Sequence, residues 1–137
     1  MGRVEIELMV VNNRDLQMAE GGALAPDKVR RFQLTGVVDT GSALLVLPAD
    51  VANRLALPGA GEVVVRYADR RTTTRPLVEQ VQIEFLGRRG TFTAIVEPDR
   101  TTALIGAVVL ETLDMLVDCK NNRVYPRDPD HIIAEVE

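Results

Sequence analysis

The strongest constraint on this chain is a polar four-residue turn, DTGS at residues 39–42, set between two apolar runs. Val37 and Val38 precede the turn, and the apolar residues 44–47 follow it. A carboxylate inside an apolar run is costly to bury unless its charge is satisfied. A simple solvated turn has no need of such flanks. The pattern therefore indicates a loop rooted in the core that brings the carboxylate of Asp39 to one defined place.

Short strand-like segments separated by turn residues cover most of the chain. Val81, Ile83 and Phe85 alternate with polar residues, which is the two-residue period of a half-buried strand, and residues 92–96 repeat the pattern. Further strands are expected at residues 4–11, 29–38, 44–47, 63–67, 72–75, 103–106, 116–118 and 123–125, and turns at 68–71, 87–90 and 121–122. Many short strands with closely spaced turns predict an all-β barrel or sandwich.

Helix is expected in only two short stretches. Residues 48–57 (PADVANRLAL) predict one helix, which ends before Pro58-Gly59, and residues 107–113 predict the other. Residues 12–28 contain Asn12-Asn13, Gly21-Gly22 and Pro26, so a long surface loop is predicted there.

The charge and hydropathy of the chain argue against two classes of binding partner, nucleic acids and membranes. Its formal net charge is −4, and its 16 lysines and arginines are scattered along the sequence. A nucleic-acid-binding surface would need a basic stripe, so we expect no nucleic-acid partner. No apolar run approaches the roughly 18 residues of a membrane-spanning helix, so we expect no membrane partner.

The chain is expected to form a single domain over residues 1–137 in the cytoplasm. Its length suits one domain, and its N-terminus lacks the features of a signal peptide. Cys119 is the only cysteine, so an intrachain disulfide is impossible, and we expect it to pack at a strand end. Asp69, Asp114 and Asp118 lack metal-ligand spacing, so neither a metal nor a cofactor is expected.

Three segments of the sequence resemble the retropepsin-like aspartic proteases. Residues 37–48 (VVDTGSALLVLP) resemble the family's active-site loop, in which an apolar strand delivers a catalytic Asp. Residues 103–113 (ALIGAVVLETL) resemble its second signature, here Leu104, Ile105 and Gly106 before a short helix, and residues 47–57 resemble the helix that follows the first motif in bacterial single-domain members. The resemblance covers residues 4–126 and implies a retropepsin-like acid-protease barrel.

The resemblance also implies a role for each residue of the DTGS turn. Asp39 would be the catalytic carboxylate. Thr40 would tie two active-site loops together through its hydroxyl, across a subunit boundary. Gly41 would let the backbone approach the carboxylate without a Cβ in the way. Ser42 would form a hydrogen bond with the outer oxygen of the carboxylate.

A flap over the substrate is implied for residues 63–75. Its tip would consist of Tyr67, Ala68, Asp69, Arg70 and Arg71. Related bacterial sequences tend to carry a glycine at this turn, and the ADRR of this chain is larger and more basic. Tyr67 is either a flap aromatic over the substrate or a plain strand residue. Arg70 and Arg71 predict a preference for acidic substrate residues near the mouth of the cleft.

The number of DTG motifs predicts a symmetric homodimer. Acid proteolysis needs two carboxylates that share one proton, because two like charges about 3 Å apart cannot both ionise. This chain has one DTG, so a two-fold axis must bring a second Asp39 beside the first. The implied activity is that of an aspartic endopeptidase, which hydrolyses a peptide or protein substrate with water activated between the two Asp39 carboxylates.

Two alternatives stay open. The same fold could serve as a catalytically silent dimerisation or peptide-binding module, since a fold does not imply a function; the altered flap keeps this alternative open, while retention of the whole DTGS turn argues against it. The second alternative is an unrelated β-barrel in which DTGS is only a turn. A Ser-His-Asp hydrolase is disfavoured, because Ser42 lacks a nucleophile elbow and the single histidine, His131, lies in a polar tail.

Overall fold

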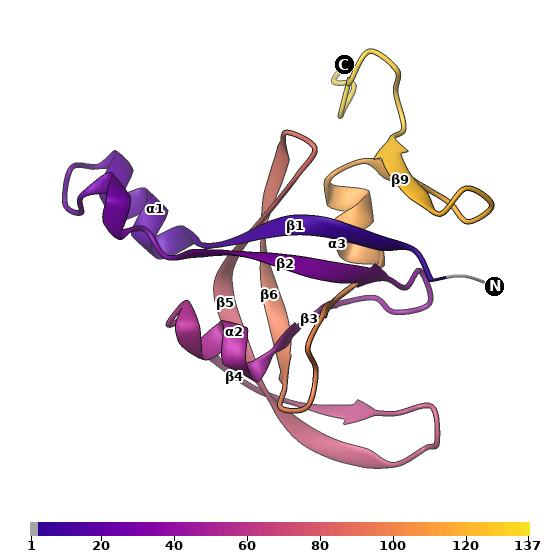
Figure 1. Cartoon of the computed structure of the whole chain (residues 1–137), viewed down its shortest axis with the longest axis horizontal. Helices are drawn as coiled ribbons and strands as arrows, with labels where there is room; N and C mark the ends of the chain where they lie inside the picture. The colour runs from indigo at the N-terminus through magenta and orange to yellow at the C-terminus, as the bar shows by residue number, and fades with distance from the viewer. Residues whose placement is uncertain (1–2) are drawn as a thin grey trace.

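The computed structural model describes residues 3–137, whose strands close into a barrel (Figure 1). Its six strands follow the order β1–β2–β7–β3–β6–β5, and β1 pairs back onto β5 to close the ring. Strand β4 pairs with β5 and continues the sheet outward. The barrel strands and β4 are β1 (Glu5–Asn12), β2 (Arg31–Val38), β3 (Leu45–Pro48), β4 (Gly59–Arg66), β5 (Thr72–Phe85), β6 (Arg88–Glu97) and β7 (Ala103–Ile105). The predicted all-β barrel is confirmed.

The core is made by the inward faces of these strands together with two short helices, α2 (Ala49–Arg54) and α3 (Ala107–Thr112), that pack on them. Aliphatic side chains dominate it, as the alternation of the sequence requires. Its most completely buried members are Val10, Leu45, Leu47, Leu55, Val81, Ile83, Ile105 and Val109. Of the two apolar runs around the DTGS turn, the later one is buried at Leu45 and Leu47, and the earlier one packs against the core through the half-buried Val38.

Strand β7 holds the two ends of the DTGS turn in place. It runs parallel to β2, with Val38 opposite Ile105, and antiparallel to β3, with Val46 opposite Leu104. Thus β2 enters the turn on one side of β7 and β3 leaves it on the other. The turn is anchored at both ends to a strand about 65 residues later in the chain, as the sequence order of the elements shows.

A helix replaces the surface loop predicted for residues 12–28. Helix α1 (Asn13–Glu20) is followed by the 3₁₀ turn η1 (Pro26–Lys28). Asn12 is its N-cap, because its Oδ1 accepts the Asp15 amide at 3.0 Å. The Asn12 side chain also donates to the Leu55 carbonyl at 2.8 Å. The loop prediction is wrong because Asn12-Asn13, taken as turn residues, start a helix instead.

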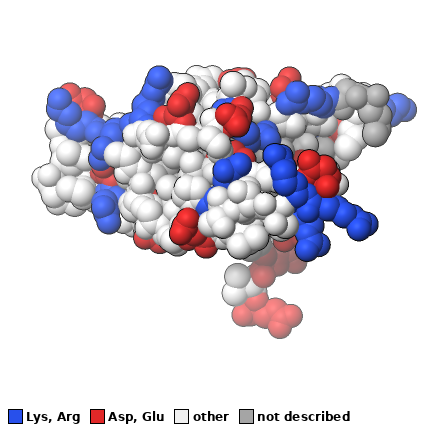
Figure 2. Space-filling model, turned by 90° about the horizontal axis from the view of Figure 1, so that it is seen from below, with Lys and Arg blue, Asp and Glu red and all other residues white. Residues whose placement is uncertain are grey.

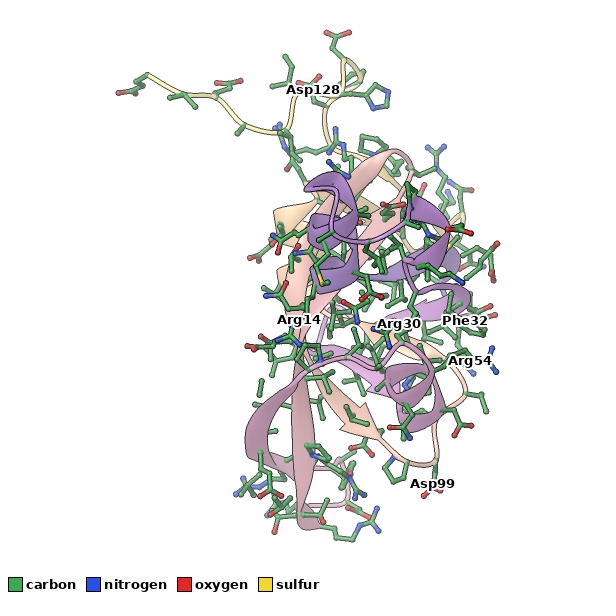
Figure 3. The ribbon with its side chains drawn as sticks, turned by 90° about the vertical axis from the view of Figure 1, so that its left-hand side faces the viewer. Arg14, Arg30, Phe32, Arg54, Asp99 and Asp128 are labelled. Carbon is green, nitrogen blue, oxygen red and sulfur yellow. The ribbon has the colours of Figure 1, made fainter. Side chains whose placement is uncertain are left out.

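The two predicted helices are confirmed as α2 (Ala49–Arg54) and α3 (Ala107–Thr112). With α1 the described chain has three short α-helices rather than the two expected. Helix α2 lies against β2 through its last residue, since the guanidinium of Arg54 sits 4.6 Å from the ring centroid of Phe32 (Figure 3). This contact holds the helix that follows the DTGS turn to the strand that precedes it.

After α3 the chain forms a separate two-stranded sheet, β8 (Met115–Asp118) and β9 (Arg123–Pro126). The predicted turn between them is confirmed. Cys119 is exposed, so the expectation that it packs at a strand end is wrong. The turn predicted for residues 87–90 is also displaced, since β6 already begins at Arg88 and the left-handed backbone falls at Leu86 and Gly87.

Arg88 has a structural reason to start a strand. Its side chain is buried and donates through Nη1 to the carbonyl of Leu113 at 2.6 Å and to that of Asp114 at 3.0 Å. It thereby binds the C-terminal end of α3, where a cation is favoured. None of the helices in residues 3–137 has the length and apolarity needed to cross a membrane.

Candidate active site

The DTGS turn is held by the second predicted motif through main-chain hydrogen bonds. The Asp39 amide donates to the Ile105 carbonyl at 3.0 Å. In the other direction, the Ala107 amide donates to the Ser42 carbonyl at 2.7 Å, and the Val108 amide donates to the Ala43 carbonyl at 3.0 Å. The structure therefore brings together two motifs that are far apart in sequence. The turn is a rigid loop, because its backbone polar groups are satisfied by β7 and by the start of α3.

Gly106 allows this close approach. A Cβ at this position would lie 2.5 Å from the Leu44 carbonyl oxygen and 2.6 Å from that of Ser42. Those atoms belong to the backbone, so no side-chain rotation could relieve the clash. Gly106 is extended, with φ −89° and ψ −176°. The position thus requires glycine for space rather than for an unusual backbone conformation.

The Asp39 carboxylate is oriented by its own loop and faces outward. The Gly41 amide donates to its Oδ1 at 3.0 Å, and the Ser42 amide donates to the Asp39 carbonyl at 3.1 Å. Asp39, Thr40 and Gly41 are exposed. Within residues 3–137 the hydroxyls of Thr40 and Ser42 make no side-chain hydrogen bond, so the bond expected from Ser42 to the carboxylate is not formed in one chain.

The residues predicted to form a flap form a hairpin, β4–β5, which projects from the barrel at the bottom of Figure 1 and is called the flap hairpin below. Its strands are longer than predicted, and its tip turns at Tyr67–Arg71, where the Arg70 amide donates to the Tyr67 carbonyl and the Tyr67 amide to the Arg71 carbonyl, both at 2.9 Å. Arg70 has a φ of 70°, a left-handed conformation that non-glycine residues adopt at a cost. Ala68, Asp69 and Arg70 are exposed at this tip.

A polar cluster that sequence reasoning missed fixes the flap to the barrel. The Tyr67 hydroxyl donates to the Glu97 carboxylate at 2.7 and 3.0 Å. Arg75 Nε donates to the same hydroxyl at 3.0 Å and to Glu97 Oε1 at 3.2 Å. The hydrogen bond with Tyr67 and the charge of Glu97 raise the pKa of Arg75. Tyr67 precedes Glu97 by 30 residues, so no local pattern announces the contact.

A cleft of about 400 Å³ lies between the DTGS loop and the flap. Ser42, Leu104 and Tyr67 contribute to its walls, so it joins the active-site loop, the second motif and the flap. Asp39 lies three residues before Ser42 and is not part of the lining. The other lining residues are Ala43, Leu44, Val46, Val65, Arg66, Ile95, Glu97 and Arg100. The lining is mostly apolar and includes three charged residues, Arg66, Glu97 and Arg100, a composition common in ligand-binding pockets.

No part of this site has the composition of a metal centre. Within residues 3–137 no group of three or more His, Cys, Asp or Glu side chains is arranged to hold a metal ion.

Comparison with known proteins identifies the fold. No protein-family model matches the sequence, and no curated protein matches it either. Among solved structures, the EIAV protease in complex with the inhibitor HBY-793 matches with a TM-score of 0.57 and 17% identity, over 80% of this chain and 86% of that one. A foamy viral protease-reverse transcriptase bound to an RNA/DNA hybrid matches with a TM-score of 0.48 and 18% identity, over 57% of this chain. This chain spans 10% of that larger protein. The chain therefore has the retropepsin-like fold, the barrel of the EIAV protease.

Proposed function

We propose that this chain is an aspartic endopeptidase that acts as a homodimer, with one Asp39 from each subunit. The observation that carries the proposal is the Asp39 carboxylate, oriented by Gly41 and exposed on a loop braced by Gly106. The adjacent cleft beneath a hairpin flap gives an extended peptide a place to bind. The retropepsin-like fold supports the same assignment.

The reaction needs only water and the two carboxylates. The ionised Asp39 takes a proton from a water molecule, whose oxygen attacks the carbonyl carbon of the scissile peptide bond. The protonated Asp39 donates to the carbonyl oxygen as it gains negative charge. The C–N bond then breaks, the leaving nitrogen receives a proton from the pair, and the products are a carboxylic acid and an amine.

A homodimer is proposed because one chain carries a single DTG and leaves it exposed. Asp39, Thr40 and Gly41 have no covering residues within one subunit. A two-fold axis at this loop would cover them and place the Thr40 hydroxyl against the partner loop. We propose further that residues 1–137 act as one domain of the bacterial single-domain type on a peptide or protein substrate.

The decisive experiment compares the wild type with Asp39→Asn on a mixed peptide library from about pH 4 to 7, where a shared-proton pair is singly ionised. The amide is nearly isosteric, so the fold and the dimer should persist while cleavage is abolished. Asp27→Asn, at an exposed aspartate of η1, is the matched control and should cut like the wild type. Equal cleavage by wild type and Asp39→Asn would show that Asp39 is not the catalyst.

A silent peptide-binding module is the second candidate, and the flap favours it. The tip lacks glycine, Arg70 is held in a left-handed conformation, and the Tyr67 hydroxyl ties the hairpin to Glu97. A flap held in this way could retain a peptide without admitting the motions of catalysis. If neither protein cuts any peptide, and both bind the same peptides with equal affinity, this second function replaces the first.

A further inference from the structure

The lining of the cleft beside the DTGS loop combines apolar and charged side chains. Leu44, Val46 and Ile95 are among the apolar ones, whereas Arg66, Glu97 and Arg100 supply the charges. Leu44 is 43% exposed, although its neighbour Leu45 is fully buried. An exposed leucine at this point offers contact area to a bound chain rather than to the core.

Glu97, the one carboxylate among the lining residues, already has a cationic partner within the protein. Glu97 accepts hydrogen bonds from the Tyr67 hydroxyl and from Arg75, and its side chain is only 15% exposed. Its charge is therefore balanced inside the protein by Arg75, and its oxygens are occupied. A negatively charged ligand would meet little repulsion from it.

Arg66 and Arg100, the two arginines of the lining, have no carboxylate partner of this kind. Among the ion pairs of residues 3–137, none joins Arg66 or Arg100 to a carboxylate within 4.0 Å. Arg100 is held in position, because its Nε donates to the Thr102 carbonyl at 3.0 Å and its Nη2 donates to the Thr102 hydroxyl at 3.3 Å. The cleft therefore presents two cations without an internal partner, of which one is already oriented.

The hairpin beside the cleft carries arginines as well. Figure 2 looks at the molecule from below and shows Lys and Arg side chains toward the right-hand end, with Asp and Glu side chains among them. The hairpin carries Arg66, Arg70, Arg71 and Arg75. The same hairpin carries Glu62 and Asp69, and its Arg71 and Arg75 pair with Asp69 and Glu97. Its charges without an ion pair within residues 3–137 therefore include Arg66 of the cleft and Arg70 of the tip.

We propose that this cleft is a substrate subsite that takes an aspartate or glutamate side chain, held by Arg66 and Arg100, beside an apolar residue of the same peptide. The inference rests on the proposed protease function and names its substrate class: peptides in which an acidic residue accompanies an apolar one near the cleaved bond. The planar guanidinium groups suit a carboxylate, because they can donate two parallel hydrogen bonds to it.

The test uses pairs of otherwise identical fluorescent apolar peptides that carry Glu or Gln at one position, which is moved along the peptide. Cleavage by the wild type should be about tenfold to hundredfold faster for the better Glu peptide than for its Gln twin. The preference should fall to near unity in Arg66→Gln/Arg100→Gln and should weaken when salt is raised from about 0.05 to 0.5 M. Arg14→Gln/Arg31→Gln removes two charges elsewhere, from α1 and the start of β2, and should keep the preference.

A second measurement separates this inference from the protease proposal. Binding of the same peptides to Asp39→Asn is followed by fluorescence anisotropy, which needs no cleavage. Tighter binding of the Glu peptide, abolished by the two arginine substitutions, supports the subsite even if no peptide is cut. Equal binding of the Glu and Gln peptides at every position overturns the subsite, and leaves the protease proposal standing if the wild type cleaves both.

Discussion

At position 106 the protein depends on the absence of a side chain. The nearest atoms to a Cβ there are the Leu44 and Ser42 carbonyl oxygens and the Ala43 carbonyl carbon, at 2.5, 2.6 and 2.8 Å. Because these atoms are backbone, a larger residue must displace the loop that carries Asp39. The close approach of Gly106 to the backbone of residues 42–44 thus fixes the loop that carries Asp39.

Gly106→Ala should therefore destabilise the protein and disable the site together. We expect the free energy of unfolding to fall by about 1–3 kcal/mol, the usual cost of overpacking, and peptide cleavage to be lost. Urea denaturation measures the first effect and a peptide assay the second. Gly59→Ala is the control, because a Cβ at Gly59 meets nothing within 4 Å. Equal stability of the two variants would contradict the close packing at Gly106.

Asp15 is a second residue whose chemistry is set by its contacts. It is 4% exposed and accepts hydrogen bonds from the Arg30 amide at 3.0 Å, from Nε at 2.8 Å and from Nη2 at 3.0 Å. The side-chain hydrogen bonds from Arg30 lower the pKa of Asp15, which outweighs the opposing effect of burial. Its folded-state pKa thus lies below the unfolded value, so the carboxylate contributes stability above about pH 4, and that contribution is lost as the pH falls through the folded-state pKa.

Asp15→Asn should consequently lower the free energy of unfolding by about 1–2 kcal/mol at pH 7. The difference from wild type should shrink as the pH falls below about 4, because Asp15 of the unfolded wild-type chain is protonated first and the folded carboxylate follows at lower pH. Chemical denaturation at a series of pH values measures both quantities. Asp27→Asn, in the same segment but exposed, should track the wild type throughout. A difference that does not change with pH would rule out the ionised pair as its source.

At the scale of elements, the flap hairpin is tied to the barrel close to its tip, at Tyr67. Tyr67 links β4, β5 and β6, because its hydroxyl bonds both Glu97 and Arg75. Its ring also supports the Arg71 guanidinium at 4.9 Å. The hairpin beyond these contacts is exposed. We therefore expect the hydrogen bonds of the Tyr67 hydroxyl, rather than a glycine at the tip, to limit the motion of the hairpin.

Tyr67→Phe should loosen the flap while leaving the barrel intact. The substitution removes the hydroxyl but keeps the ring under Arg71, so we expect amide hydrogen exchange in residues 59–75 to quicken about fivefold or more. The melting temperature should change little. Tyr125→Phe in β9 is the matched control, since the Tyr125 ring carries Arg123 at 4.7 Å in the same manner but far from the flap. Unchanged exchange in the flap would mean that Tyr67 is not its tether.

At the scale of the whole molecule, the decisive question is the number of chains. One chain supplies one Asp39, exposed on the surface, whereas the proposed chemistry needs two carboxylates in contact.

Sedimentation at micromolar concentration should accordingly give twice the 15.1 kDa chain mass. Thr40→Val should shift the equilibrium toward single chains, because buried partners of the hydroxyl across the two-fold axis would lose it. Ser42→Ala, which deletes a hydroxyl in the same loop, should leave the dimer in place. A strictly monomeric chain that still cleaves peptides would refute the dimer, and equal dissociation of both variants would refute the role given to Thr40.

The sequence was informative wherever a structure depends on neighbours in the chain. Alternation at Val81, Ile83 and Phe85 located a strand, and the run from Pro48 located α2. The apolar flanks of DTGS predicted a loop rooted in the core, which the burial of Leu45 and Leu47 confirms. These signals are local, because the residues that favour a turn and the alternation of apolar and polar side chains both lie within a short stretch of sequence.

Contacts between distant residues decided the rest. Asn12 caps a helix rather than a turn because its side chain reaches Leu55 and its neighbour Asp15 finds Arg30. Tyr67 and Glu97 meet only after β4, β5 and β6 have paired. The sequence alone thus determined where most of the strands, the DTGS loop and the β4–β5 hairpin lie. Only the tertiary structure decided how polar residues pair, because the energy of a buried hydrogen bond or ion pair depends on a partner that folding brings from elsewhere in the chain.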